Sequence, residues 1–213
     1  MLKPVPGKLS AQPAAADLRA SYFSRSTYWR GIHLHILFVC TGNICRSPTA
    51  ERLAAAIGAQ LQIPNFEASS AGTRAVVGHP IHHDAAVVLQ GLGGGDGSGF
   101  SARQLAPRII SNADLILAMT IEHRNGVLEQ APHKLHRTFT LAEAAQLASD
   151  FHPASIEDLA RLRPQLASEK VRDIPDPIGR NQQFFEMVGS RIAELLPPVL
   201  ALCQQAACRS AAE

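Results

Sequence analysis

The stretch that decides the fold is Val39-Cys40-Thr41-Gly42-Asn43-Ile44-Cys45-Arg46-Ser47-Pro48. The apolar run from Leu34 to Val39 precedes it and predicts a buried strand. Apolar residues then recur at helical spacing from Pro48 to Leu61. A strand, a polar loop and a helix N-terminus build an anion site, because the loop N–H groups converge at the positive end of the helix dipole. The stretch therefore predicts an oxyanion pocket after the first strand.

Two side chains of this loop carry reactive chemistry. Cys40 begins the loop, and Arg46 closes it six positions later. Convergent N–H donors favour a thiolate at Cys40, and the planar guanidinium of Arg46 matches two phosphate oxygens. Ser47 can donate a hydrogen bond to the sulfur. The plain alternative is a buried cysteine and a surface arginine, but Gly42 and Asn43 tolerate the left-handed backbone that such a loop requires. The pattern favours nucleophilic phosphate-ester chemistry.

The stretch from Phe38 to Glu51 resembles the signature of the low-molecular-weight protein tyrosine phosphatases. The resemblance covers roughly Leu34 to Cys203. It implies an α/β fold with a four-stranded parallel sheet flanked by helices, the Rossmann-like phosphotyrosine phosphatase type I fold. Four later stretches support it: Ser70-Ala71-Gly72-Thr73, Ala102-Arg103-Gln104, Ala113 to Met119, and Asp176-Pro177.

Length and charge predict one compact domain over residues 34–208, which the resemblance implies is a phosphatase domain, after a basic and flexible N-terminal extension over residues 1–33. The chain has 213 residues and is 46% apolar, which is enough for one sizeable core. Residues 1–33 hold five basic residues and one acidic residue, so the net charge of +2 leaves −2 for the remainder. The body is therefore not expected to bind nucleic acid. Its affinity for anions must be local, in the loop.

Cysteine content and hydropathy indicate the setting of the protein. Four cysteines in this length do not make a disulfide framework, and two of them lie in the loop. We expect a reducing, cytoplasmic environment. No apolar run approaches the roughly 18 to 20 residues of a membrane span. The histidines show no paired spacing that would hold a metal, and neither a metal nor another cofactor is expected.

Strand-like and helix-like segments alternate along the chain, which predicts parallel strands with right-handed crossovers and a ligand site at their carboxyl ends. The run from Gly91 to Gly99 is expected to be a surface loop. Expected strands are Leu34–Val39, Phe66–Ser70, Ala113–Met119 and Leu135–Phe139. Expected helices are Pro48–Leu61, Ile81–Leu89, Ile121–Gln130 and Leu141–Ala148, followed by a polar, helix-prone connection over Asp150–Val171. Apolar residues from Phe184 to Leu195 predict a last helix, which Pro197-Pro198 is expected to interrupt or kink.

Thiolate attack on a phosphate ester is slow unless the leaving oxygen is protonated as it departs, so a carboxylic acid is expected beside the loop. Asp173-Ile174-Pro175-Asp176-Pro177 supplies two candidates. Prolines on both sides restrict the backbone of Asp176. The resemblance also places the general acid at the Asp-Pro position, so we assign this role to Asp176. Asp173 is the second candidate, and a purely structural turn is the plain alternative.

The resemblance assigns roles to the other loop residues. Ser70 would hydrogen-bond Asn43 and, with Ser47, support the loop, although an ordinary strand-end serine is an equal alternative. Cys45 matches the family's backup thiol, which would form a protective disulfide with Cys40; the alternative is a small buried residue. The expected catalytic residues are Cys40, Arg46 and Asp176, and the expected phosphate-binding residues are Thr41, Gly42, Asn43, Ile44, Cys45, Arg46 and Ser47.

The expected function is hydrolysis of phosphotyrosine in a protein or peptide through a phosphocysteine intermediate. Three positions depart from the family pattern. Arg74 to Gly78 and Ile178-Gly179 lack the aromatic residues that usually grip the phenyl ring, and Phe100 replaces a histidine. Protein arginine phosphatase is an alternative, although its members typically carry threonine where this chain has Ile44. Arsenate reduction on the same fold is disfavoured, because it would require relay cysteines in the middle of the chain and none lies between Cys45 and Cys203. A non-catalytic phosphate-binding module is a further alternative, and the presence of Cys40, Arg46 and Asp176 argues against it.

Overall fold

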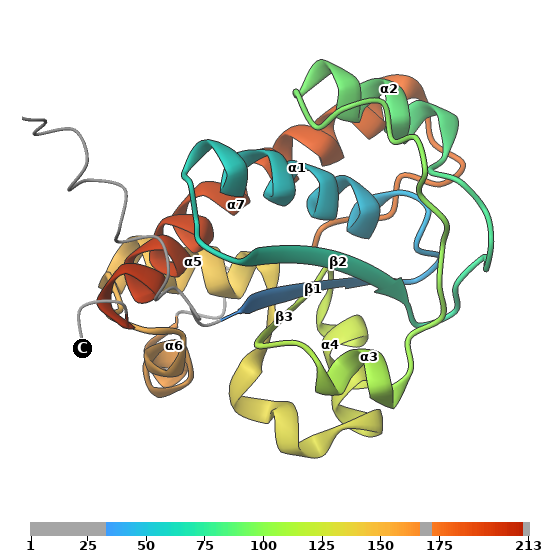
Figure 1. The fold of residues 1–213 in the computed structure, drawn as a ribbon. Helices are drawn as coiled ribbons and strands as arrows, with labels where there is room; N and C mark the ends of the chain where they lie inside the picture. Colours follow the sequence, from blue (N-terminus) through green and yellow to red (C-terminus); the bar gives the residue numbers. More distant parts are fainter. Residues whose placement is uncertain (1–32, 167–171, 211–213) are drawn as a thin grey trace, which may run out of the picture. The chain divides into compact units, whose positions relative to one another are not determined.

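Four parallel strands form the centre of the fold (Figure 1). The computed structural model describes residues 33–166 and 172–210, which belong to one unit of the chain, Gly31–Glu213. The strand order is β2-β1-β3-β4, so β1 is an inner strand and all seven of its residues are buried. This sheet confirms the predicted fold class. The strands are β1 Leu34–Cys40, β2 Phe66–Gly72, β3 Leu115–Ala118 and β4 Thr138–Thr140.

The strand register aligns the carboxyl ends of the three neighbouring strands. Cys40 pairs with Gly72 of β2, and Val39 pairs with both Ala71 of β2 and Ala118 of β3. In a parallel sheet, segments that follow neighbouring strands emerge at the same edge. The loop after Cys40 therefore lies beside the segments that follow Gly72 and Ala118.

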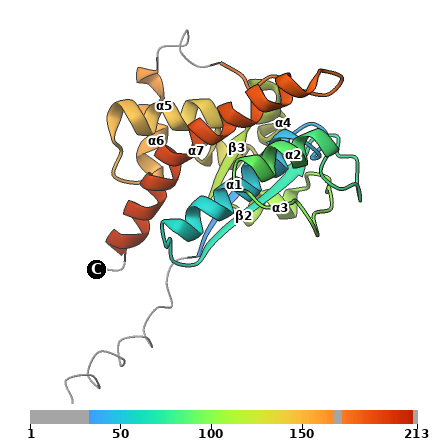
Figure 2. The ribbon, with the colours of Figure 1, turned by 90° about the horizontal axis from the view of Figure 1, so that it is seen from above.

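Helices cover both faces of the sheet (Figures 1 and 2). Alternate residues of β1 point to opposite faces. Ile36 and Phe38 pack with the layer of α1, α2, α5 and α7, whereas Leu37 and Val39 pack with α3 and α4. Apolar side chains thus cover both faces of the sheet. The polar loops at its carboxyl edge are left to form a ligand site. The helices are α1 Arg46–Gln60, α2 His83–Gly91, α3 Pro107–Ser111, α4 Ile121–Gln130, α5 Leu141–Phe151, α6 Ile156–Leu162 and α7 Gln182–Ser210, with short 3-10 helices η1 Pro132–Arg137 and η2 Arg163–Gln165.

The fourth strand differs from the expectation. The predicted strand over Leu135–Phe139 is wrong in its first half, because η1 Pro132–Arg137 occupies that segment and β4 begins at Thr138. Proline fixes a φ angle that suits the first turn of a helix. The hydroxyl of Thr138 donates to the Lys134 carbonyl at 2.9 Å and closes the end of η1.

The prediction that Pro197-Pro198 interrupts the last helix is wrong, whereas the alternative, that the two prolines kink it, stays a prediction. Both prolines lie inside α7, which continues for 29 residues to Ser210. A proline in a helix interior costs about 3 kcal/mol. Around the two prolines, however, Leu195, Leu196, Val199 and Leu200 are all buried in the core. Each such side chain contributes roughly 1.5–3 kcal/mol, so packing outweighs the local penalty.

One sequence prediction falls almost entirely outside the described residues, and a second falls there in a small part. The N-terminal extension over residues 1–33 lies there except for His33, and so do residues 167–171 of the predicted polar connection. Within residues 33–166 and 172–210, no helix is long and apolar enough to cross a membrane. The cytoplasmic setting stays a prediction.

Candidate active site

The loop after β1 turns sharply before α1 begins at Arg46. Asn43 has a φ of +54°, the left-handed region, which asparagine tolerates better than most residues. The N-cap residue Cys45 makes no side-chain cap hydrogen bond, and the first turn of α1 contains no acidic side chain. The positive end of this helix dipole is therefore not neutralised by its own residues. It is available for an anion held in the loop.

A short hydrogen-bond chain supports the Cys40 sulfur. The Ser47 hydroxyl lies 2.9 Å from Cys40 Sγ. The Asn43 side-chain amide donates to Ser47 Oγ at 2.9 Å and to Ser70 Oγ at 2.7 Å. Because Ser47 Oγ already accepts a hydrogen from Asn43, its own hydrogen is free to point at the sulfur. The bond between Asn43 and Ser70 is the one that the family resemblance implies.

The chain continues away from the sulfur to Glu51 and Arg103, whose roles the sequence did not reveal. The Ser70 hydroxyl donates to Glu51 Oε2 at 2.6 Å, and the Arg103 backbone N–H donates to Asn43 Oδ1 at 2.8 Å. Burial raises the pKa of Glu51, although the hydrogen bond from Ser70 opposes that effect. The Asn43 side-chain amide thus makes three hydrogen bonds, two as donor and one as acceptor, so this left-handed residue is held from both sides.

Arg46 is buried and connects the loop to the segment before α7. Its Nη1 donates to the Ile174 carbonyl at 3.1 Å, and its Nη2 forms an ion pair with Asp176 Oδ2 at 2.6 Å. Its Nε is buried and has no hydrogen-bond partner among the described residues. A buried donor without an acceptor is costly. This guanidinium therefore has a donor to offer to an anion in the loop.

The segment that carries Asp176 is fixed against the end of β3. The Ile121 N–H donates to Asp173 Oδ1 at 2.9 Å, and the Ile174 N–H donates to the Met119 carbonyl at 2.9 Å. Asp173, the second candidate for the acid, thus holds the N-terminus of α4. The side chain of Asp176 is 48% exposed, so it can reach solvent and a ligand.

Cys40, Arg46 and Asp176 line one cavity of about 270 Å³ at the carboxyl end of the sheet. The sequence places Asp176 130 positions after Arg46, and the fold brings the two side chains together. Within the described residues, no three His, Cys, Asp or Glu side chains are grouped to hold a metal ion. The other residues that line the cavity are Thr41, Gly42, Ile44, Cys45, Arg74, Val76 and Ile178.

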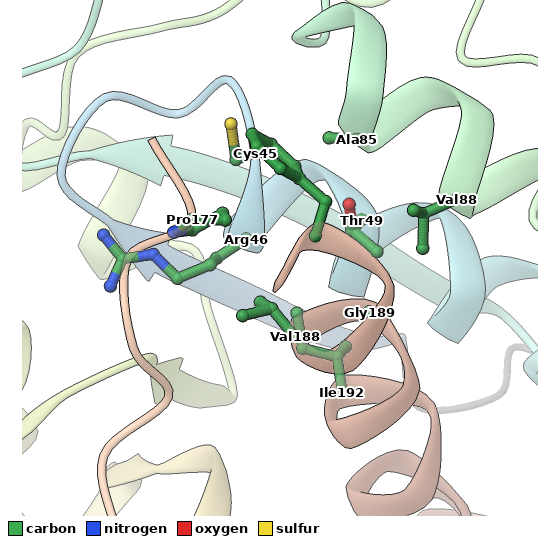
Figure 3. Close-up of a pocket in the computed structure, with 10 residues that line it drawn as sticks. Cys45, Arg46, Thr49, Ala85, Val88, Pro177, Val188, Gly189 and Ile192 are labelled. Atoms are coloured by element: carbon green, nitrogen blue, oxygen red, sulfur yellow. The ribbon is translucent and has the colours of Figure 1, made fainter. Parts of the chain in front are cut away.

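Cys45 lines the catalytic cavity and also a separate, small cavity of about 10 Å³ between α1, α2 and α7 (Figure 3). Figure 3 shows the Arg46 guanidinium pointing away from the apolar side chains of α2 and α7. Burial, together with the nearby Cys40 and Asp176, raises the pKa of Cys45 to about 12. Cys45 is therefore a protonated thiol at neutral pH, and it is not paired in a disulfide.

A buried histidine ties the loop to α4, and the sequence did not single it out. His123 Nε2 lies 2.8 Å from Thr41 Oγ1, and His123 Nδ1 lies 2.8 Å from Thr120 Oγ1. Burial lowers the pKa of His123 to about 4, and the positive charge of Arg46 adds to the effect. The ring is therefore neutral at pH 7. Its only sequence signal is its position three residues after Thr120, the residue that caps α4.

Gly72 permits the close approach of β2 to the loop. A Cβ atom at this position would lie 2.4 Å from the carbonyl oxygen of Thr41, which is backbone and has little freedom to move. The Thr73 N–H also donates to the Cys40 carbonyl at 2.9 Å. The close contact with the loop thus requires glycine at position 72. From the sequence alone, this glycine was only part of a stretch that resembles the family.

The outer wall of the cavity is aliphatic. Ile44, Val76 and Ile178 supply apolar surface, and Arg74 adds one positive charge. Val76 is 39% exposed and Ile178 is 48% exposed. Val76 and Ile178 belong to the two segments that lack the family's usual aromatic residues. The structure places both segments at the mouth of the cavity, as the departures from the family pattern suggested.

A sequence model of the low molecular weight phosphotyrosine protein phosphatases matches residues 35–158 of this chain. The chain belongs to this family. The match contains the whole loop and, apart from Leu34, all four strands of the sheet, and it confirms the resemblance read from the sequence. It also confirms the expectation of a hydrolase of the protein phosphatase class.

Individual relatives represent two activities. The low molecular weight protein-tyrosine-phosphatase Etp of Escherichia coli K12 is 33% identical over 153 residues, or 72% of this chain and 83% of Etp. A protein-arginine-phosphatase of Geobacillus stearothermophilus is 39% identical over 108 residues, or 51% of this chain and 69% of the relative. The crystal structure of the tyrosine phosphatase Wzb from E. coli K30, in complex with sulphate, superimposes with a TM-score of 0.60 at 25% identity, covering 80% of this chain and 98% of Wzb.

Proposed function

We propose that this phosphatase hydrolyses phosphotyrosine in proteins through a phosphocysteine intermediate. One observation carries the proposal: Cys40, Arg46 and Asp176 line the same cavity at the N-terminus of α1. A nucleophile, a binding fork for phosphate oxygens and a carboxyl group beside them are the parts that this chemistry needs. The substrates are then phosphoproteins, in agreement with the family.

In the first step, the Cys40 thiolate attacks phosphorus, and the bond between phosphorus and the phenolic oxygen breaks. Asp176, in its protonated form, donates its proton to that oxygen, so tyrosine leaves neutral. The loop N–H groups and Arg46 bind the three equatorial oxygens, whose charge they stabilise without moving. The Ser47 hydroxyl, 2.9 Å from the sulfur, favours the thiolate before the attack.

In the second step, water attacks the phosphocysteine. Asp176, now a carboxylate, accepts a proton from this water, and the bond between phosphorus and sulfur breaks. The sulfur leaves as a thiolate, which the Ser47 hydroxyl again stabilises. Inorganic phosphate departs, and both Cys40 and Asp176 return to their starting protonation states.

The ion pair between Arg46 and Asp176 suggests how substrate changes the site. Arg46 Nη2 holds Asp176 Oδ2 at 2.6 Å, while Arg46 Nε has no partner among the described residues. A phosphate group would take both donors in the bidentate geometry that arginine favours. Asp176 would then be released beside the dianionic phosphate, which favours the protonated carboxyl needed for the first step.

The cavity wall supports phosphotyrosine as the substrate. Ile44, Val76 and Ile178 offer an apolar surface for a phenyl ring, and Asp176 is the sole carboxylate among the described residues that line the cavity. A phosphorylated guanidinium would find no second carboxylate there. The similarity to the Geobacillus protein-arginine-phosphatase nevertheless makes phosphoarginine the second candidate.

Turnover of p-nitrophenyl phosphate by wild type, Cys40→Ser and Asp176→Asn tests the proposal. We expect metal-independent activity in wild type, inhibition by vanadate and no measurable activity in Cys40→Ser. Asp176→Asn should lose roughly 10²–10⁴-fold in kcat, the usual contribution of a positioned acid. Full activity of Cys40→Ser would exclude the phosphocysteine.

A peptide comparison then tests the substrate class. Peptides of one sequence carrying phosphotyrosine, phosphoserine or phosphoarginine should be ranked by kcat/KM. We expect phosphotyrosine to be preferred. A preference for phosphoarginine would keep the mechanism of Cys40 and replace the substrate.

A further inference from the structure

A second cavity, of about 370 Å³, adjoins the catalytic cavity. Thr41 and Arg74 line both of them, so the two spaces meet at these two side chains. The second cavity opens between the segment after β2 and one face of α4. Its remaining lining residues are Thr73, Glu122, His123, Asn125, Gly126 and Glu129.

One wall of this cavity is acidic. Glu122, Gly126 and Glu129 are four and three positions apart on α4, and helix residues at this spacing share one face. Both glutamates are exposed. Neither carboxylate has a hydrogen-bond or ion-pair partner among the described residues. Two carboxylates therefore line the cavity without a direct partner in the described part of the chain.

The helix leaves room in front of this wall. Gly126 lies in the interior of α4, where alanine would be more favourable. A Cβ atom there would meet nothing closer than Thr73 Cγ2 at 3.5 Å, which is ordinary contact. Packing therefore does not require glycine at this position. Its effect is to keep the cavity open.

The charges change sign along the two cavities. Arg74 lies where they meet, beside the place that the phosphate dianion would occupy, and the two carboxylates lie beyond it. His123 adds no charge of its own, since both ring nitrogens are hydrogen-bonded to threonine hydroxyls and the ring is buried. A peptide with a negative phosphotyrosine and a positive neighbour would match this order.

We propose that the second cavity is a substrate subsite that receives a lysine or arginine side chain flanking the phosphotyrosine, with Glu122 and Glu129 determining the preference. This inference rests on the proposed function, because it needs a phosphopeptide in the catalytic cavity. It names the class of substrate within phosphotyrosine proteins. The glutamates do not touch the reacting atoms, so they act on specificity and not on the chemical step.

The test is a panel of phosphotyrosine peptides with lysine, glutamine or glutamate placed in turn at the three positions on either side. For wild type we expect kcat/KM to be roughly three- to tenfold higher with lysine than with glutamine in at least one position, as a pair of exposed ion pairs allows. The double variant Glu122→Gln, Glu129→Gln should reduce this ratio to below about twofold. Raising the ionic strength should reduce the ratio in wild type as well.

Two controls separate the subsite from the catalytic site. Glu186 and Glu194 are exposed on α7 and line neither cavity, so Glu186→Gln, Glu194→Gln removes the same charge without changing the ratio. p-Nitrophenyl phosphate has no flanking residue, and its turnover should be equal in wild type and both double variants. Gly126→Leu should fill the cavity and lower kcat/KM for the preferred lysine peptide, again with unchanged turnover of p-nitrophenyl phosphate.

The possible failures are distinguishable. Absence of p-nitrophenyl phosphate turnover in wild type would overturn the proposed function. Normal turnover without a preference for lysine, or with a preference that persists in Glu122→Gln, Glu129→Gln, would overturn the subsite alone. A preference for glutamate in the peptide would also overturn it, and would assign the selection to Arg74.

Discussion

The two ends of the catalytic cavity differ in how firmly their side chains are held. At the inner end, Cys40 and Arg46 line the cavity and are supported by Asn43 and Ser47. These four residues are between 0% and 4% exposed, and each takes part in a hydrogen bond to a neighbouring residue. At the rim, Ile178 is nearly half exposed and its side chain offers only apolar contact. The inner end is therefore specified by many interdependent contacts, whereas the rim can change without disturbing them. This difference separates the chemistry of the phosphate from the choice of the group that carries it.

The largest effect is expected where β2 touches the loop. In Gly72→Ala, the new methyl group would lie 2.4 Å from the Thr41 carbonyl oxygen and would displace the loop. A displacement of this kind should lower kcat/KM for p-nitrophenyl phosphate by about 10²-fold. Gly91→Ala is the matched control, because a Cβ atom there meets nothing within 4 Å. Equal activity of the two variants would show that the inner end tolerates change as well as the rim does.

The second prediction uses the pH dependence of stability. The pKa of His123 is lowered from 6.5 to about 4, so the unfolded chain binds this proton at higher pH than the native protein does. The free energy of unfolding should therefore fall as the pH decreases from 6.5 towards 4, by on the order of 2–3 kcal/mol from this residue. Urea unfolding of His123→Gln should show a flatter pH dependence over the same range. Parallel curves for the two proteins would contradict the buried neutral ring.

The third prediction concerns the carboxylate that ends the hydrogen-bond chain. Glu51→Ala removes the acceptor of the Ser70 hydroxyl, so Ser70 and Asn43 lose their fixed orientation. We expect kcat/KM for p-nitrophenyl phosphate to fall by about tenfold, or about 1.4 kcal/mol. Glu51→Gln keeps an acceptor oxygen and should retain most of the activity. A loss that is the same in both variants would indicate that the charge, and not the hydrogen bond, matters.

The smallest effect is expected at the rim. Ile178→Tyr introduces an aromatic wall where this chain has an aliphatic one, and should raise kcat/KM for phosphotyrosine peptides by roughly two- to tenfold, since such contacts contribute about 0.5–1.5 kcal/mol. The free energy of unfolding should change by less than about 0.5 kcal/mol, as is usual at exposed positions. Met187→Tyr, at an exposed residue that does not line the cavity, is the control. A loss of stability in Ile178→Tyr would mean that the rim is as constrained as the loop.

Local pattern and the family resemblance together predicted much of the fold and of the loop. Alternating strands and helices predicted parallel pairing, and the turn residues and charged groups predicted the loop from Cys40 to Ser47, whereas the resemblance supplied the four-stranded sheet and the role of Asp176. Predictions failed where local preference and packing disagree, as at Pro197-Pro198 inside α7 and at the 3-10 helix that replaces half of the fourth predicted strand. The apolar residues beside the two prolines could have indicated a buried helix, but their burial depends on α1 and α5.

The sequence by itself determined the groups of the loop, because Cys40, Asn43, Arg46 and Ser47 are close in the chain and their order dictates the local turn. The tertiary structure alone decided which distant residues join them. Asp176 meets Arg46 across 130 positions, Glu51 reaches the loop through Ser70, and His123 reaches it through Thr41. These contacts depend on the register of β1 with β2 and β3 and on the packing of α1 and α4. No local pattern encodes such distances, since they arise only when separate segments are packed together.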